Sequence, residues 1–258
     1  MLNRRLTGAA LGLAALALVA TSCSAGGNAP SSTTAVGQTL TIGMPNGTQT
    51  ENSNPFMNTS SAMSLGYAFA MYEPLAQVNS IKPTMDPVPW LATAWKWSTD
   101  FTSVVFEIRD GVKWSDGQAL TAKDVAYSLS LRKDNAALNL DALPYQDVKS
   151  DAKTVTVTFT TSQFVNQNKV LSLFIVPEHI WTKIADPTKD LNQKPIGSGP
   201  YVLKSWTPQA SILVQNTSYW GGKPAVPELR YTSYHDNNSL TTAPANGEAQ
   251  WGWRVIPD

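Results

Sequence analysis

The side chains that could perform acid–base or metal chemistry are few and scattered in this sequence. Its 258 residues contain two histidines, and each stands beside a single acidic residue, as Glu178-His179 and His235-Asp236. Neither has a second ligand three or four residues away, which a helical metal site would supply. We therefore interpret both histidines as structural residues and expect no metal site and no cofactor.

Asp110 and Asp116 are the carboxylates that invite comparison with the acid–base pair of a glycosidase. Each stands directly before a glycine, in a context typical of a turn, which favours a backbone role. No serine lies in a nucleophile elbow. The sequence therefore does not indicate an enzyme, and a secreted hydrolase remains an alternative that activity dependent on either aspartate would support.

The glycine-rich segment 195–201 (PIGSGPY) is similar in composition to a phosphate-binding loop. Such a loop needs free backbone N–H groups and a following helix. Pro200 removes one donor, and the next residues read as a strand, so we interpret the segment as a tight turn that uses the freedom of glycine in φ. The net charge is zero, from 19 basic and 19 acidic residues, which argues against a nucleic-acid partner.

The N-terminal segment is typical of a targeting signal. Arg4 and Arg5 precede an apolar run over 9–20, which is too short to cross a bilayer and is typical of a secretory signal. The small residues before Cys23 resemble the bacterial lipoprotein signal, in which the cysteine is acylated. We expect a signal peptide over 1–22, lipidation of Cys23, and a flexible polar tether over 23–37. An ordinary cleaved signal is the alternative.

The remaining chain reads as mixed α/β, with more strands than helices. A helix is predicted over 63–75, and a second helix begins at Thr121, where Asp124 completes a capping box, and ends near Asp134. Asp110-Gly111 predicts a hairpin in which 112–114 pairs back on the preceding strand. Strands are predicted over 39–43, 104–109, 153–159, 201–206, 211–215 and 228–234.

Trp251 and Trp253 are two residues apart, so in an extended segment they share one face. An aromatic pair of this kind suits the apolar face of a sugar or the side chains of a peptide. A place in the hydrophobic core is an equally good interpretation.

The order of motifs over 39–258 resembles the extracytoplasmic solute-binding proteins of peptide-type ABC importers, a family that includes nickel and oligosaccharide binders. The most specific motif is FEIRDGVKWSDG followed by LTAKDV, over 106–125. Gln250 stands where the family usually has Asp. The other segments that carry the resemblance are YEPL (72–75), PWLA with two tryptophans (89–97), GSGPY (197–201), Asn216 with Tyr219-Trp220, and NGE (246–248).

The resemblance implies a type II periplasmic-binding-protein fold, in which two lobes close on a solute. It places a first-lobe core at 38–62 and 172–258 and an inserted subdomain at 63–171. Family members are close to twice as long, so we expect the second lobe to be missing from this sequence.

The resemblance also implies a function without covalent chemistry. We expect a lipoprotein, anchored to membrane lipid through Cys23 outside the cytoplasmic membrane, that delivers oligopeptides to ABC permease subunits. Asn54 and Phe56 are expected to contact the solute, with Trp253 and Trp251 as the aromatic platform. An oligosaccharide binder of the same family is one alternative, and a truncated, non-transporting interaction protein is another.

Overall fold

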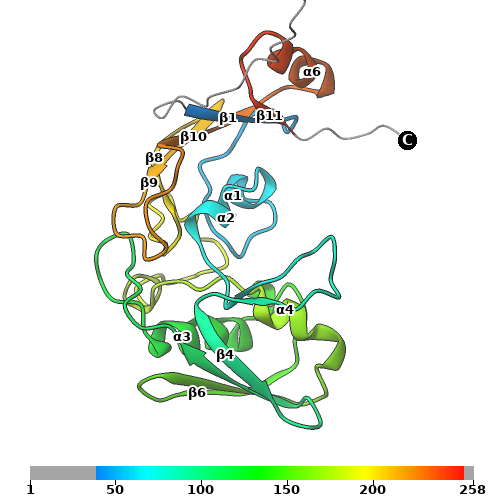
Figure 1. Ribbon diagram of the computed structural model, residues 1–258, viewed down its shortest axis with the longest axis vertical. Coiled ribbons are helices and arrows are strands. Elements are labelled where there is room, and N and C mark those ends of the chain that lie inside the picture. The colour runs from blue at the N-terminus through cyan, green and yellow to red at the C-terminus, as the bar shows by residue number, and fades with distance from the viewer. Residues whose placement is uncertain (1–38, 253–258) are drawn as a thin grey trace, which may run out of the picture. The chain divides into compact units, whose positions relative to one another are not determined.

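The computed structural model describes residues 39–252, which form two larger β-sheets and a two-stranded sheet, joined by short helices and loops (Figure 1). All of these residues fall within one compact unit. The mixed α/β class expected from the sequence is confirmed. Cys23, Trp253 and the segments predicted as signal and tether lie outside the described residues.

The first sheet has five strands in the order β11-β1-β10-β9-β8. β1 runs parallel to both of its neighbours, β10 and β11, whereas β8, β9 and β10 pair antiparallel. The start and the end of the described chain therefore meet in one sheet, and the four strands predicted for this part of the chain are confirmed. The five strands of the sheet are β1 Thr39–Met44, β8 Tyr201–Thr207, β9 Ala210–Gln215, β10 Glu228–Ser233 and β11 Trp251–Gly252.

The second sheet has four antiparallel strands in the order β4-β5-β7-β6: β4 Ala92–Trp97, β5 Ser103–Ile108, β6 Tyr145–Ser150 and β7 Thr154–Phe159. The alternation of KTVTVTF is confirmed, because Val155, Val157 and Phe159 are buried while the threonines between them are partly exposed. Val125 and Leu129 of α3 (Ala122–Asp134) belong to the same core cluster.

The start of α3 follows the predicted capping box. The side chain of Thr121 accepts a hydrogen bond from the amide of Lys123, and Asp124 Oδ2 accepts the amide of Thr121 at 2.8 Å. The other oxygen of Asp124 accepts the amide of Glu178 at 3.0 Å, at the start of α5 (Glu178–Trp181). One buried carboxylate therefore organises the beginnings of two helices.

Two local predictions are wrong. The predicted helix over 63–75 is replaced by α1 (Ser61–Ser64) and α2 (Ala68–Met71), which are separated by Gly66 at φ +83°. The predicted hairpin at 110–111 does not form, because both edges of β5 are already paired with β4 and β7. The chain instead turns back at 115–117, where Lys113 bridges Ala119.

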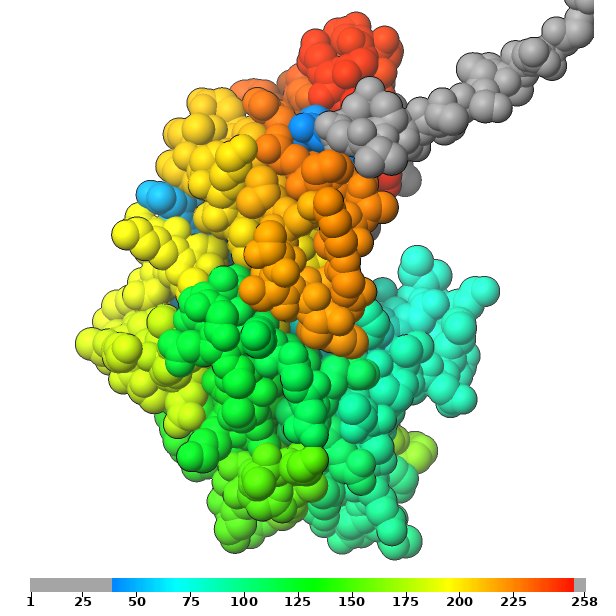
Figure 2. Space-filling view, turned by 60° about the vertical axis from the view of Figure 1, so that its left-hand side comes forward, coloured from blue at the N-terminus to red at the C-terminus, as the bar shows by residue number. Residues whose placement is uncertain are grey.

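The remaining elements are short. They are β2 Ala76–Gln77, β3 Val88–Pro89, α4 Gln167–Leu171 and α6 Asn237–Ala245, with 3₁₀ turns at Ala136–Leu138 and Phe164–Asn166. Figure 2 shows the orange segment that follows β9 lying against the green segment that follows β5. There Arg109 lies 4.3 Å from the ring centroid of Trp220.

Candidate functional site

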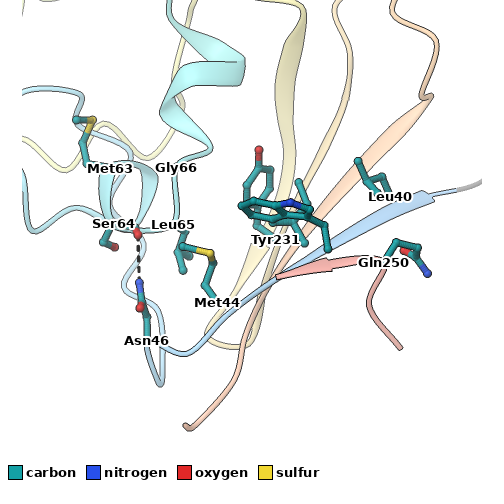
Figure 3. A pocket seen from close by; sticks show the side chains of 11 residues that line it. Leu40, Met44, Asn46, Met63, Ser64, Leu65, Gly66, Tyr231 and Gln250 are labelled. Carbon is teal, nitrogen blue, oxygen red and sulfur yellow. Dashed lines mark hydrogen bonds between the residues drawn. The ribbon is translucent and has the colours of Figure 1, made fainter. Parts of the chain in front are cut away.

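One face of the five-stranded sheet forms a concave, mostly apolar cavity of about 830 Å³, which we call the sheet hollow. Figure 3 shows the side chains of its strands together with the segment Met63–Gly66 that faces them. Asn46 Nδ2 donates to the carbonyl oxygen of Ser64 at 3.1 Å and so fixes this segment to the end of β1. The hollow is lined by Leu40, Ile42, Met44, Asn46, Met63, Ser64, Leu65, Gly66, Tyr231, Gln250 and Trp251.

The parallel register places three of these side chains in one row across the sheet. Ile42 pairs with Tyr231 on one side and with Trp251 on the other. Burial raises the pKa of Tyr231 to about 12, so its hydroxyl is neutral at physiological pH. Trp251 is 53% exposed, so its indole is accessible from the hollow. The row therefore offers a neutral, largely apolar surface that ends in an accessible indole.

The short strand β11 is held in place from two directions. The backbone amide of Gln250 donates to the carbonyl of Thr41 at 3.0 Å, and the side-chain oxygen of Gln250 accepts the amide of Thr41 at 2.8 Å. On the opposite face, Leu240 of α6 occupies the space that side chains at Gly43 and Gly252 would need. Successive side chains of a strand point to opposite faces of the sheet, so Trp251 points into the hollow. Gly252, the next residue, leaves room for α6 on the other face.

Residues 86–258 match the family described as bacterial extracellular solute-binding proteins, family 5 Middle. This chain belongs to that family. Relatives of the chain include protein XP55 of Streptomyces lividans, 35% identical over 62% of this chain and 30% of that protein. The nickel-binding periplasmic protein of Escherichia coli is 31% identical over 76% of this chain and 37% of that protein. The chain thus spans about a third of the length of these curated relatives.

Solved structures agree with the family and its fold. A periplasmic oligopeptide-binding protein of Thermotoga maritima with bound mannohexaose matches with a TM-score of 0.74 and 26% identity, covering 85% of this chain and 42% of that one. The oligopeptide-binding protein AppA of Bacillus subtilis, in complex with a nonapeptide, matches with a TM-score of 0.72 and 25% identity, covering 84% of this chain and 44% of that one. The described part of this family-5 chain therefore has the fold of somewhat less than half of a type II periplasmic-binding protein, consistent with part of its first lobe.

Of the four side chains predicted to contact solute, the structure describes three, and these three do not line one cavity. Trp251 lines the sheet hollow, and Trp253 lies outside the described residues. Asn54 is fully buried; its amide donates to the carbonyls of Pro187 and Asp190 at 3.1 and 2.7 Å. Phe56 is 2% exposed. The hydrogen bonds of Asn54 show a role in loop structure, and a solute contact of either residue stays a prediction.

The histidine and aspartates that were considered for acid–base chemistry have structural partners in the family-5 chain. His179 Nε2 lies 2.7 Å from Asp116 Oδ2, while the other oxygen of Asp116 accepts the amide of Gln118 within the turn. Asp110 forms an ion pair with Lys153 at 2.8 Å. Over residues 39–252, no cluster of three or more His, Cys, Asp or Glu side chains could hold a metal ion.

The glycine-rich turn serves a purpose different from the expected one. Gly197 and Gly199 do not have positive φ. Both instead lie against backbone: a Cβ at Gly197 would overlap the carbonyl oxygen of Met71, and one at Gly199 would lie 2.6 Å from the carbonyl oxygen of Ala70. Glycine is needed here for close approach of two backbone segments.

The family-5 chain also contains a buried carboxylate, Glu73, that the sequence did not single out as a functional residue. Glu73 is 2% exposed and accepts hydrogen bonds from the indole N–H groups of Trp90 at 2.7 Å and Trp220 at 3.1 Å. Burial raises the pKa of Glu73, although these hydrogen bonds oppose the effect. The signal in the sequence is a lone Glu between apolar residues, which does not reveal its partners far along the chain.

Over 39–252, none of the helices combines the length and the apolar character needed to span a bilayer.

Proposed function

We propose that this protein is the solute-binding lipoprotein of an ABC importer, which captures oligopeptides outside the membrane and delivers them to permease subunits. Membership of family 5 supports this role. The observation that carries it is the sheet hollow, a concave apolar wall with a half-exposed indole, because ligand sites are mostly apolar surfaces with a few oriented polar groups.

The segments 38–62 and 172–258 are proposed as the first-lobe core, with 63–171 as an inserted subdomain. The strands support this division, because the five-stranded sheet uses only residues 39–44 and 201–252, while the four-stranded sheet uses only residues 92–159. More than half of the T. maritima structure has no counterpart here. We propose that a second lobe supplies the other wall of the crevice and that closure follows solute binding.

Oligopeptide is the first choice of solute and oligosaccharide the second. The relatives include oligopeptide-binding and D,D-dipeptide-binding proteins, and one similar structure holds mannohexaose. An indole such as that of Trp251 can pack against either kind of solute. Anchoring through Cys23 is part of the same proposal and rests on the sequence before the tether.

A thermal-shift screen of the full chain against defined di- to nonapeptides and against mannohexaose and β-linked oligosaccharides tests the proposal. A rise in melting temperature with peptides alone is expected, because a ligand that binds only the folded state stabilises it. A rise with sugars alone would replace peptide by oligosaccharide. No rise with any solute at millimolar concentration would contradict a solute-binding role for this chain.

A further inference from the structure

A second cavity, of about 340 Å³, adjoins the sheet hollow, because Met63 lines both. We call it the arginine hollow. Two large apolar side chains at it are strongly exposed, Phe69 at 67% and Leu140 at 52%. Apolar groups of this size in water are typical of a surface that receives a ligand or partner. Its lining also includes Phe56, Arg132, Asn139, Asp141, Ser172 and Phe174.

Arg132 is the cationic side chain that lines this hollow. The side chain belongs to α3 and is only 5% exposed. Nη1 and Nη2 donate to the carbonyl oxygens of Ser128 and Phe174, both at 2.8 Å, and the guanidinium lies 4.5 Å from the ring centroid of Phe56. These contacts use two of the five N–H groups of the guanidinium and hold it in one orientation.

The charge of Arg132 has no ion-pair partner in the described chain. Burial lowers its pKa to about 10, so it remains protonated at neutral pH. Asp141 also lines the hollow and favours the charged form of Arg132. However, its Oδ1 atom forms its ion pair with Lys169, at 3.8 Å. A buried cation without a paired anion is costly, and an anion that enters the hollow would offset this cost.

We propose that the arginine hollow binds a carboxylate group of the solute. A planar guanidinium matches a carboxylate in shape and charge. The adjoining apolar part of the solute packs against Phe69 and Phe174, whose rings lie 5.0 Å apart. This inference rests on the proposed solute-binding function and deepens it, because a carboxylate requirement selects peptides and excludes neutral oligosaccharides.

Two probes that differ only in charge test the inference on the unmodified full chain. N-acetyl-L-phenylalanine carries an aromatic ring and a carboxylate, and its amide carries the same ring without the charge. Titration of ¹⁵N-labelled protein should shift the amide signals of Asn139, Ser172 and Phe174. The acid should bind about ten-fold or more tightly than the amide, because hydrogen bonds to charged groups are the stronger ones. Equal affinities, or no shifts at these residues, would overturn the inference.

A variant that leaves the guanidinium in place provides a second test. Asp141→Asn removes the negative charge at the hollow, so it should strengthen binding of the acid two-fold or more and leave the amide unchanged. Asp147→Asn is the matched control, because Asp147 is paired with Lys149 on β6 and does not line the hollow. An identical response of both variants would count against the site.

The outcomes separate this inference from the proposed function. If peptides raise the melting temperature but the acid and amide bind equally, the carboxylate subsite is rejected and the solute-binding role stands. If the acid binds selectively but no peptide or sugar stabilises the protein, the hollow binds anions and the proposed function fails.

Discussion

The amide nitrogen of Gly199 lies 2.9 Å from the carbonyl oxygen of Met71, which joins the loop before β8 to the end of α2. A Cβ on Gly197, two residues earlier, would overlap that same oxygen. This close approach holds α2, whose Ala68 and Met71 are buried, against β8 of the five-stranded sheet. The backbone rather than a side chain therefore determines the spacing here.

Gly197→Ala should lower the free energy of unfolding by about 3 kcal/mol or more, because a backbone carbonyl has to move. Gly43→Ala is the comparison, since its Cβ would meet the ends of the Leu240 and Tyr234 side chains, which can rotate. We expect a smaller loss there, about 1–2 kcal/mol. Urea denaturation measures both, and equal losses would show that the close approach at Met71 is not a constraint.

Glu73 should make stability depend on pH in a specific direction. Its pKa in the folded protein is raised above the ordinary value of 4.5, so the folded state holds the proton more tightly than the unfolded state. Stability therefore falls as the pH rises from about 4.5 through the raised pKa. Glu73→Gln removes this titration. As the pH rises through this window, the free energy of unfolding of the wild type should fall relative to that of Glu73→Gln.

Asp186 provides a control of opposite sign. Hydrogen bonds from Thr188 and Lys189 lower the pKa of Asp186 to about 2. Its contribution is present above its ordinary pKa of 3.8 and is lost as the pH falls toward 2. The difference between wild type and Asp186→Asn should thus shrink at low pH. Parallel pH profiles for the Glu73 and Asp186 variants would contradict both assignments.

Asp124→Ala should cost more stability than Thr121→Ala. Removal of the threonine cap costs about 1 kcal/mol. Asp124 accepts backbone amides at the starts of both α3 and α5, and it is 5% exposed, so its loss should cost about 2–3 kcal/mol. Chemical denaturation of the two variants gives the comparison, and a cost for Asp124→Ala equal to that for Thr121→Ala would show that the link to α5 contributes nothing.

Lipidation of Cys23 is tested in cells. Expression of the full chain in a bacterium with labelled palmitate should give a labelled protein in the membrane fraction. Cys23→Ser should remain unlabelled and leave that fraction, since the acyl chains supply the anchoring energy. Label retained in the serine variant would reject Cys23 as the acylated residue.

The sequence predicted the elements that depend on local patterns. The alternation in KTVTVTF and the capping box at Thr121 both appear as expected, because neighbouring residues decide them. The hairpin at Asp110-Gly111 failed because strand pairing from residues 92–97 and 154–159 had already filled both edges of β5. β6 was missed because its residues alternate only weakly between buried and exposed positions.

The candidate site was harder to predict than the local elements, because contacts between residues far apart in the sequence form it. Trp251 lies at the sheet hollow because β11 pairs with β1, which joins residues about 200 positions apart, and a sequence pattern cannot show such a pairing. Asn54 was singled out for its polarity, yet its partners at 187 and 190 fix a loop. The sequence predicted only that Arg132 lies in a helix, because the residues that bury it in the folded protein are far from it in the sequence.

Isothermal titration of a stabilising peptide into the wild type and into Trp251→Ala tests the central claim most directly. Phe164→Ala is the control, because Phe164 is 63% exposed and lines neither hollow. We predict that loss of the indole weakens peptide binding about ten-fold or more, while Phe164→Ala binds as the wild type does. Unchanged affinity in Trp251→Ala would contradict the sheet hollow as the solute-binding surface.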